Sequence, residues 1–463
     1  MEVGRRALLG GAALAGAALA ASCAPAAVSP SPSATTSASA DPSSSPSPSP
    51  TGGAGPFGLK SPSTIQVLIH SGAFGTSLID GAATRLQDRH PGVTVATQAA
   101  LDIQAVLGPG LDKGAFDLIH NGGTNRVNLS SAHARLADLT TLLDAPSLDD
   151  EPIRNSLFSA ALRSVTDAGG RRALPYTLIA HGLWYSERAF AKNALMPPTT
   201  WAQLVELGQH ATTRGGYLFA WDEHNVDDYL ELAITAAIKD GGDEVRVALD
   251  SLAEDAWSHP CVVGAIDALA QLAADGHLRH EVGATGLWAS GSGPLLIPAG
   301  ARIVRQTVGV RDEEFAPVVA AVPTVSGRPQ LASSAIHAGA EDEFLVPATG
   351  TNQAGAFELL RTMFSRATAS EFSRLNEVPT VVHGSSQGIE SVSLRSQARL
   401  IAGAGAQSFT WRFVEHYGLG AESNAALSDM LRRKATPEQT RRRLQSLCDK
   451  VRNDPNVEHY PVR

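Results

Sequence analysis

The sequence has few aromatic residues and few cysteines, and it has no excess of positive charge. Phe, Trp and Tyr make up 5% of the chain, so each tryptophan near a loop deserves a specific explanation. The formal net charge is -9, which excludes the basic footprint of a nucleic-acid-binding protein. The histidines are scattered, and neither H-E-x-x-H nor C-x-x-C occurs. The sequence therefore indicates no metal site and no cofactor.

Two of the three cysteines lie in the part of the chain that we expect to fold. For Cys261 and Cys448 we expect free thiols, because a chain of 463 residues can bury a core large enough for stability without a disulfide. A disulfide between them stays open as an alternative, since the chain is predicted to leave the cytoplasm.

Residues 1–22 have the pattern of a secretory signal peptide. Arg5 and Arg6 precede an uncharged run, rich in Ala, Leu and Gly, that is too short to span a membrane comfortably. Small residues lead to Cys23 in a sequence close to a bacterial lipobox, although Ala20 stands where Leu is usual. We expect export and a lipid on Cys23. Twin-arginine export is a plausible route, and a plain secretory signal with an incidental cysteine is the alternative.

A tether is predicted to follow. Residues 23–62 consist almost wholly of Ser, Pro, Ala, Thr and Gly after the cysteine, so they bury no core and should stay extended. Fully stretched, about 40 residues reach roughly 130 Å. A lipid on Cys23 would then hold a folded module near a membrane partner.

The folded part opens with alternating strands and helices. Strands are predicted at 63–70, 93–97 and 115–120, with helices between them, which is typical of a parallel sheet covered by helices. Ligands bind at the carboxyl ends of such strands. This places the loops 71–74 and 121–124 at a cleft, with Phe74 and Asn121 as candidate contacts.

The middle of the chain forms an ordered series around residues 171–190. Leu174-Pro175-Tyr176 precedes a buried strand that contains His181 and Trp184, and a short helix follows. Pro197-Pro198-x-Thr200-Trp201 then opens the next helix, with Thr200 as its N-cap. The segments 135–144, 293–300 and 436–439 flank this series.

This series resembles the extracellular solute-binding proteins of carbohydrate ABC transporters, most closely the N-acetylglucosamine- and chitobiose-binding lipoproteins. The resemblance covers nearly all of the mature chain. It implies a two-lobe α/β fold of the periplasmic-binding-protein type (type II), with a ligand cleft between the lobes and no enzymatic activity. Lobe 1 would comprise 63–172 and about 331–375, and lobe 2 would comprise 173–330 and about 376–463.

The resemblance also implies a function. A monomeric lipoprotein on the outer face of the cell membrane would capture a sugar by hinge closure and deliver it to an ABC permease. N-acetylglucosamine, chitobiose or another oligosaccharide would be the ligand. A ligand-sensing lipoprotein without transport is the alternative.

A sugar needs flat aromatic side chains for its ring face, and carboxylates, amides or arginine for its hydroxyls. Core packing is the alternative for each tryptophan, and Trp201 is assigned to packing because it opens a helix. The candidate ligand contacts are Phe74, Asn121, Tyr176, His181, Trp184, Trp221, Asp222, Glu223, Trp288, Arg302 and Trp411.

Arg302 departs from the family pattern, which has a tryptophan after the Pro-x-Gly turn that Pro298 and Gly300 form here. An acidic or modified sugar would explain an arginine there, and so would the loss of transport-type binding. A solvated strand-end position is the other interpretation.

A secreted serine hydrolase is the remaining alternative, because residues 384–388 match G-x-S-x-G with Ser386 at the centre. Asp429 and His459 are the candidate acid and base downstream of Ser386, and they fit the expected pattern only loosely. The glycine and serine content, with Pro379 in the supposed strand, favours a loop instead.

Overall fold

The computed structural model describes residues 55–462, apart from 108–110, 112, 124, 159–160, 163–165, 168–169 and 313. The predicted signal peptide, Cys23 and residues 24–54 lie outside the described part. Residues 55–62, which the sequence assigns to the tether, already join the fold, because Leu59 is buried and the Phe57 ring packs on Phe357 at 5.3 Å. No helix among the described residues has the length and apolar character needed to cross a membrane.

The first sheet has five strands in the order β2-β1-β3-β13-β6. β1 runs parallel to both β2 and β3, whereas β13 is antiparallel to β3 and β6. The strands are β1 (Ser63–His70), β2 (Val93–Ala100), β3 (Leu118–Asn121), β6 (Ala173–Leu174) and β13 (Glu343–Leu345). The three predicted parallel strands are confirmed. The bounds of β1 are as predicted, whereas those of β2 and β3 differ from the prediction by a few residues.

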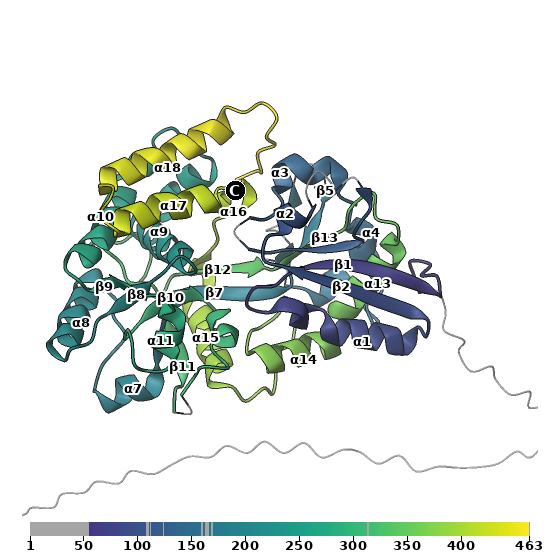
Figure 1. The fold of residues 1–463 in the computed structure, drawn as a ribbon, viewed down its shortest axis with the longest axis horizontal. Helices are drawn as coiled ribbons and strands as arrows, with labels where there is room; N and C mark the ends of the chain where they lie inside the picture. Colours follow the sequence, from purple (N-terminus) through teal and green to yellow (C-terminus); the bar gives the residue numbers. More distant parts are fainter. Residues whose placement is uncertain are drawn as a thin grey trace, which may run out of the picture. The chain divides into compact units, whose positions relative to one another are not determined.

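Helices cover both faces of this sheet (Figure 1). Side chains alternate along a strand, so Ile65 and Val67 face one core while Leu68 faces the other. The first core contains residues of α1 (Asp80–Arg89) and α13 (Gln353–Met363), and the second contains residues of α2 (Ile103–Leu107) and α3 (Leu129–Ala132). Further elements of this half are α4 (Thr140–Asp144), α5 (Ile153–Ser156) and α14 (Arg366–Asn376).

The second sheet is built around the long strand β7 (Thr177–Ser186). Its order is β10-β7-β12-β14, and β11 also pairs with β7. Pro175 lies just before β7, as expected for a residue that lacks an N–H donor. The other strands are β10 (Ile297–Gly300), β11 (Pro317–Ala320), β12 (Ile336–Glu341) and β14 (Ser408–Phe409), while β8 (Phe219–Trp221) pairs separately with β9 (Leu278–His280).

A large helical core packs beside the second sheet. Trp201 is buried in it, as predicted, and both Thr200 and Thr436 form capping boxes at helix starts. Cys261 and Cys448 are both free thiols. The helices are α7 (Glu187–Lys192), α8 (Trp201–Thr213), α9 (Val226–Asp250), α10 (Pro260–Ala274), α11 (Ala284–Ala289), α12 (Ile303–Gln306), α15 (Val392–Ala404), α16 (Phe413–His416), α17 (Gly420–Leu431) and α18 (Pro437–Arg452).

The chain passes between the two sheets at short connections. Pro175 and Tyr176 link β6 to β7, and Asp342 alone links β12 to β13. Residues 336–341 therefore lie in the second sheet, although the sequence grouped them with lobe 1. The chain changes sheets at Asp342, whose positive φ of 56° produces the bend between the two strands.

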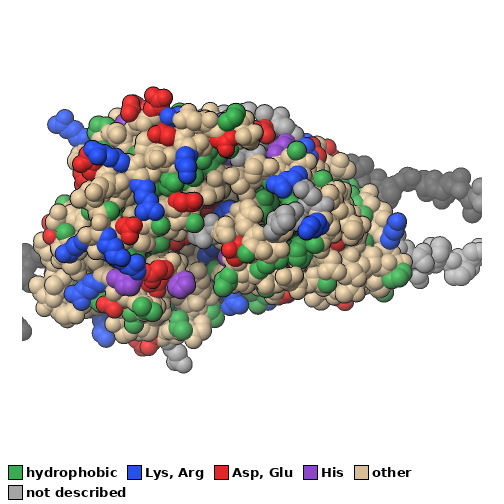
Figure 2. Space-filling model, turned by 45° about the horizontal axis from the view of Figure 1, so that its top comes forward, with side chains coloured by type: hydrophobic (Ala, Val, Ile, Leu, Met, Phe, Trp, Pro, Cys, Tyr) green, Lys and Arg blue, Asp and Glu red, His purple; other side chains and the backbone are tan. Residues whose placement is uncertain are grey.

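The surface carries charges of both signs. Figure 2 shows Lys and Arg side chains interspersed with Asp and Glu over the visible face, with small apolar areas between them. The whole sequence contains 37 Lys and Arg residues and 46 Asp and Glu residues.

Candidate functional site

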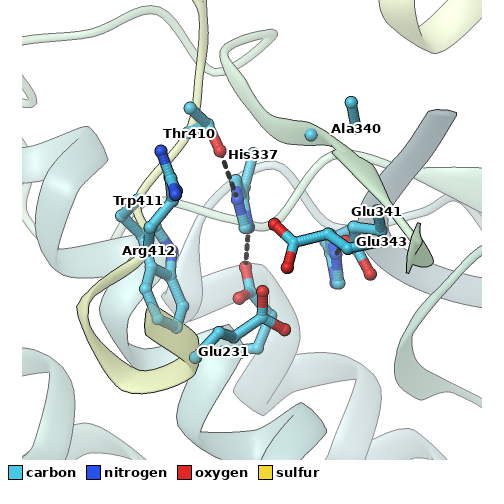
Figure 3. Close-up of a pocket in the computed structure, with 11 residues that line it drawn as sticks. Glu231, His337, Ala340, Glu341, Glu343, Thr410, Trp411 and Arg412 are labelled. Atoms are coloured by element: carbon cyan, nitrogen blue, oxygen red, sulfur yellow. Dashed lines mark hydrogen bonds and ion pairs between the residues drawn. The ribbon is translucent and has the colours of Figure 1, made fainter. Parts of the chain in front are cut away.

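A cavity of about 50 Å³ lies where β7, β12 and α9 approach the segment that follows β14 (Figure 3). Strands and helices hold most of its walls, so the side chains are positioned by regular backbone. The lining residues are His181, Glu231, His337, Gly339, Ala340, Glu341, Glu343, Thr410, Trp411, Arg412 and Glu415.

A row of side chains across the second sheet forms part of this cavity. Gly300 pairs with His181, and His337 pairs with Phe409, while the β7–β12 ladder places His337 opposite His181. Adjacent strands lie about 4.8 Å apart. The His181 and His337 rings accordingly stack at 4.7 Å and 13°. Trp411 extends the stack, with its ring 5.3 Å from that of His337.

Each imidazole contacts one carboxylate. His337 Nδ1 lies 2.6 Å from Glu231 Oε1, and His181 Nε2 lies 2.7 Å from Glu341 Oε1. An ionised carboxylate only accepts hydrogen bonds, so these nitrogens carry the protons. When an imidazole is neutral, its other nitrogen is an acceptor. Thr410 faces His337 Nε2 at 3.4 Å, but His181 Nδ1 is buried without a partner.

Burial and charge tune this group. Burial lowers the pKa of His181 to about 4, so its ring is neutral at pH 7. Burial opposes the ionisation of Glu231, but the two imidazolium charges that form in acid, together with hydrogen bonds from His337 and Thr235, outweigh it and lower the pKa of Glu231 to about 2. At neutral pH the cavity therefore combines ionised carboxylates with at least one uncharged imidazole.

The stacked geometry is unsuited to a metal ion. His181, Glu231 and His337 offer ligand atoms within 4.8 Å of one another, and they are the one such group among the described residues. A metal binds in the plane of each imidazole, along the nitrogen lone pair. Two planes that are nearly parallel and separated by the strand spacing cannot both contain the ion. We therefore assign no metal to this cluster.

Arg302 reaches the edge of the cavity through protein carboxylates. Its guanidinium forms an ion pair with Glu341, and its Nε lies 3.7 Å from Asp342 Oδ1. Burial opposes ionisation of Asp342, but the Arg302 charge and hydrogen bonds from His120 and Thr177 lower its pKa. The positive charge of Arg302 is thus compensated within the protein, which weakens the case for an acidic ligand.

Residues 75–369 match the family of bacterial extracellular solute-binding proteins. The chain belongs to this family. The diacetylchitobiose binding protein NgcE of Streptomyces coelicolor is 32% identical to this solute-binding protein over 416 residues, which cover 88% of this chain and 89% of NgcE.

Solved structures share the fold of this solute-binding protein. A chitin oligosaccharide binding protein superposes with a TM-score of 0.67 at 13% identity, over 84% of this chain and 100% of its own. The GacH receptor of Streptomyces glaucescens gives 0.66 at 15% identity, over 86% of this chain and 99% of its own. The predicted two-lobe α/β fold is confirmed.

The structure brings three predicted contacts to the cavity of this solute-binding protein. His181 and Trp411 line it, and Arg302 adjoins it through Glu341. Asn121 instead holds its own loop, because its amide bonds the backbone of Val127 at 2.7 and 3.2 Å.

Four other predicted contacts lie in apolar cores. Tyr176 and Phe74 both pack against Phe372, at 5.2 and 5.3 Å. Trp184 and Trp288 are almost wholly inaccessible to solvent, and Trp184 donates its indole N–H to the Ala299 carbonyl at 3.1 Å. These four residues remain sequence predictions as ligand contacts, and their packing roles are what the structure displays.

Trp221, Asp222 and Glu223 form a separate group at the end of β8, away from the cavity lining. Asp222 Oδ2 accepts the backbone N–H groups of Gly283 and Ala284 at the start of α11. Glu223 pairs with Arg432 and, at 3.2 Å, with His280, and both partners lie against the Trp221 ring.

None of the four carboxylates that line the cavity was predicted as a ligand contact from the sequence. Glu231 lies within a helix, and Glu341 and Glu343 belong to two short strands of different sheets. A signal was available: His337, Gly339, Glu341 and Glu343 occur at every second position, and side chains at this spacing point to one face of an extended chain.

Ser386 lies in a turn over residues 383–388, outside any strand-to-helix elbow. Its predicted partners are engaged elsewhere, since His459 Nδ1 lies 3.2 Å from the Tyr417 hydroxyl and Asp429 pairs with Arg443. The residues described around Ser386 do not form a nucleophile, base and acid array.

Proposed function

We propose that this protein is the substrate-binding lipoprotein of an ABC importer for a sugar, with N-acetylglucosamine, chitobiose or another oligosaccharide as ligand. The observation that carries the proposal is the 32% identity to a diacetylchitobiose binding protein over 88% of the chain. Identity spread over both lobes supports a shared architecture and a shared class of ligand.

The chemistry of the cavity supports a sugar ligand. Carboxylates and imidazole nitrogens accept hydrogen bonds from hydroxyl groups, and the Trp411 indole, stacked on His337, offers a ring edge and an unpartnered buried N–H. This combination suits a polyhydroxylated ring better than an apolar ligand.

Hinge closure supports capture. The cavity of about 50 Å³ is much smaller than the roughly 300 Å³ or more of a typical ligand site. A sugar therefore enters only when the lobes separate, and its contacts with both lobes then favour the closed state. The single-residue link at Asp342 and the two-residue link at Pro175 and Tyr176 are the proposed hinges.

Membrane anchoring belongs to the same proposal. A diacylated Cys23 and the tether after it would keep the monomer at the outer face of the membrane, beside its permease. Replacing Cys23→Ser should release the protein into the medium, as measured by immunoblotting of cell and medium fractions. Full retention of the variant on cells would contradict the anchor.

Calorimetric titration tests the sugar site. The chain from residue 24 onward is titrated with N-acetylglucosamine, diacetylchitobiose and a panel of neutral sugars. We expect saturable binding that Trp411→Phe weakens by about tenfold, since loss of the indole N–H and part of the ring costs roughly 1.4 kcal/mol.

Two tryptophan variants serve as matched controls. Trp257 lies in the helical core, and Trp221 lies at the end of β8. Neither Trp257→Phe nor Trp221→Phe should therefore change the affinity for the sugar. A loss of affinity only in Trp221→Phe would move the site to the end of β8. No binding of any sugar would refute the proposed function.

A further inference from the structure

The cavity has an excess of negative charge. Four carboxylates line it, from Glu231, Glu341, Glu343 and Glu415, against the single arginine Arg412. The Arg412 guanidinium lies over the Tyr460 ring at 5.0 Å and 3.4 Å from His416 Nδ1, so it is engaged on the side of the C-terminal segment.

Nearby arginines compensate part of this charge. Arg302 pairs with Glu341, and Arg126 reaches Glu415 at 3.2 Å. Glu231 forms hydrogen bonds with His337 and Thr235. Of these two partners, only His337 can carry a positive charge, and only when its ring is protonated. The Arg126 charge also acts on Glu343, so the two arginines compensate part, but not all, of the negative charge around the cavity.

Two further carboxylates lie beside Glu231. Asp227 and Asp228 occupy the first turn of α9, four and three residues before Glu231, so they share its side of the helix. Among the described residues, neither forms an ion pair. Asp227 is exposed and Asp228 is half-buried. Burial and the neighbouring charge of Asp227 raise the pKa of Asp228, whereas the charge of Arg302 acts in the opposite direction.

Two buried polar atoms indicate independently that the cavity is built for a ligand. His181 and Trp411 are each more than nine-tenths buried and line the cavity, yet His181 Nδ1 and Trp411 Nε1 have no hydrogen-bond partner. A buried polar atom without a partner costs about 1–3 kcal/mol. A bound molecule with hydroxyl groups satisfies the donor and the acceptor together.

We propose that this cavity binds an amino sugar whose nitrogen is protonated and not acetylated. An ammonium group brings one positive charge and three N–H donors but no acceptor, which matches a cavity of carboxylates and a neutral imidazole. An acetamido group brings no charge and adds a carbonyl that requires a donor. The inference rests on the proposed function, and it specifies the class of sugar.

Titration of the two matched disaccharides is the test. The chain from residue 24 onward is titrated with the β-1,4-linked glucosamine dimer and with its diacetylated counterpart, at a pH low enough to protonate the amine. We expect the free amine to bind at least about tenfold more tightly, equivalent to roughly 1.4 kcal/mol. Raising the salt concentration from about 0.02 M to about 0.5 M should weaken only the binding of the amine.

Charge-removing variants identify the origin of the preference. Asp228→Asn and Glu343→Gln should each reduce the affinity for the glucosamine dimer by about fivefold or more, and should change that for the acetylated dimer by less than about twofold. Asp88→Asn, an exposed aspartate on α1, is the matched control and should change neither affinity.

The outcomes separate the two proposals. If the acetylated dimer binds as tightly as the amine or more tightly, the inference is overturned while the sugar-binding function stands. If neither dimer nor any neutral sugar binds, both fail. If the amine binds more tightly but the two charge variants leave its affinity unchanged, these carboxylates are not its site and the inference is overturned.

Discussion

His181 and His337 illustrate how the backbone controls the chemistry of single residues. Their rings stack because β7 and β12 are neighbours, and each ring forms a hydrogen bond with a different carboxylate. The result is a pair of stacked imidazoles inside a cavity lined by four carboxylates. Small changes at this pair should therefore be visible in the dependence of stability on pH.

The pKa of His181 predicts acid sensitivity. Its folded value of about 4 lies below the unfolded value of roughly 6.5, so the folded state resists protonation. Its contribution to stability is complete above about pH 6.5 and is lost progressively toward pH 4, by at most about 3 kcal/mol. His181→Gln keeps an N–H for Glu341, and should make urea unfolding less dependent on pH over this range.

Other histidines require a control. Burial also lowers the pKa of His70 to about 4 and that of His416 to about 3, so part of the pH dependence persists in any single variant. His224→Gln changes an exposed residue and should leave the pH profile unaltered. The charged and titratable groups that act on His181 are Glu231, Glu341, His337, Arg302 and Glu415, and an unchanged profile in His181→Gln would assign the effect to them.

Arg302 should act on stability more than on ligand choice. Arg302→Gln leaves Glu341 and Asp342 without their counter-charge, and should lower the free energy of unfolding at pH 7 by about 2 kcal/mol. Arg302 holds the pKa of Asp342 down, so this loss is present above the unfolded pKa of about 4 and shrinks in acid. Denaturant titrations at pH 7 and near pH 3 measure the difference.

The matched variant Arg374→Gln removes an exposed arginine from α14 and should be neutral at both pH values. Equal losses from Arg302→Gln at both pH values would show that its contribution does not come from the carboxylate charges.

At the scale of elements, α9 combines a structural bend with a functional face. Within α9 the backbone of Gly242 is not helical, with φ of 70° and ψ of -154°, so the element consists of two helical segments that meet at a kink. The segment before the kink contains Glu231, which lines the cavity, and Asp227 and Asp228 in the first turn of the helix. The bend is possible because glycine tolerates this backbone conformation.

Gly242→Ala should therefore destabilise the protein by about 1 kcal/mol or more, since an L residue is strained at this φ. Gly264→Ala, in regular helix α10 with no atom near the added methyl group, should be neutral or stabilise by up to about 1 kcal/mol. Thermal unfolding of both variants gives the comparison. Equal stability of the two would mean that the bend is not strained by a side chain.

At the scale of the molecule, ion pairs between the halves bear on closure. Arg126 follows β3 of the first sheet, and Glu415 belongs to α16 beside the cavity, so their 3.2 Å contact joins the two halves. Both side chains retain contact with solvent, so the pair contributes no more than about 1 kcal/mol. A ligand that contacts both halves can shift an equilibrium between open and closed states that depends on an energy of this size.

Small-angle X-ray scattering tests the proposed closure. Saturation with a bound sugar should lower the radius of gyration of the chain from residue 24 onward, because the ligand favours the closed state. Glu415→Gln removes the contact with Arg126 and should raise the radius of gyration without ligand, while Glu422→Gln on α17 should not. An identical scattering profile with and without a bound sugar would contradict hinge closure.

The sequence by itself determined the class of the protein and many of its elements. Strand β1 and the helix opened by Thr200 and Trp201 were both predicted, because β-branched runs and N-caps act within a few residues. The order of motifs from 171 to 201 pointed to the family for a similar reason, since each motif is local.

Only the tertiary structure decided the site. His181, Glu231, His337 and Trp411 are far apart in the chain, and strand register and helix packing bring them together. The same packing placed Trp184 and Trp288 in apolar cores. Local sequence encodes strands and caps, whereas burial and charge compensation depend on which distant residues become neighbours.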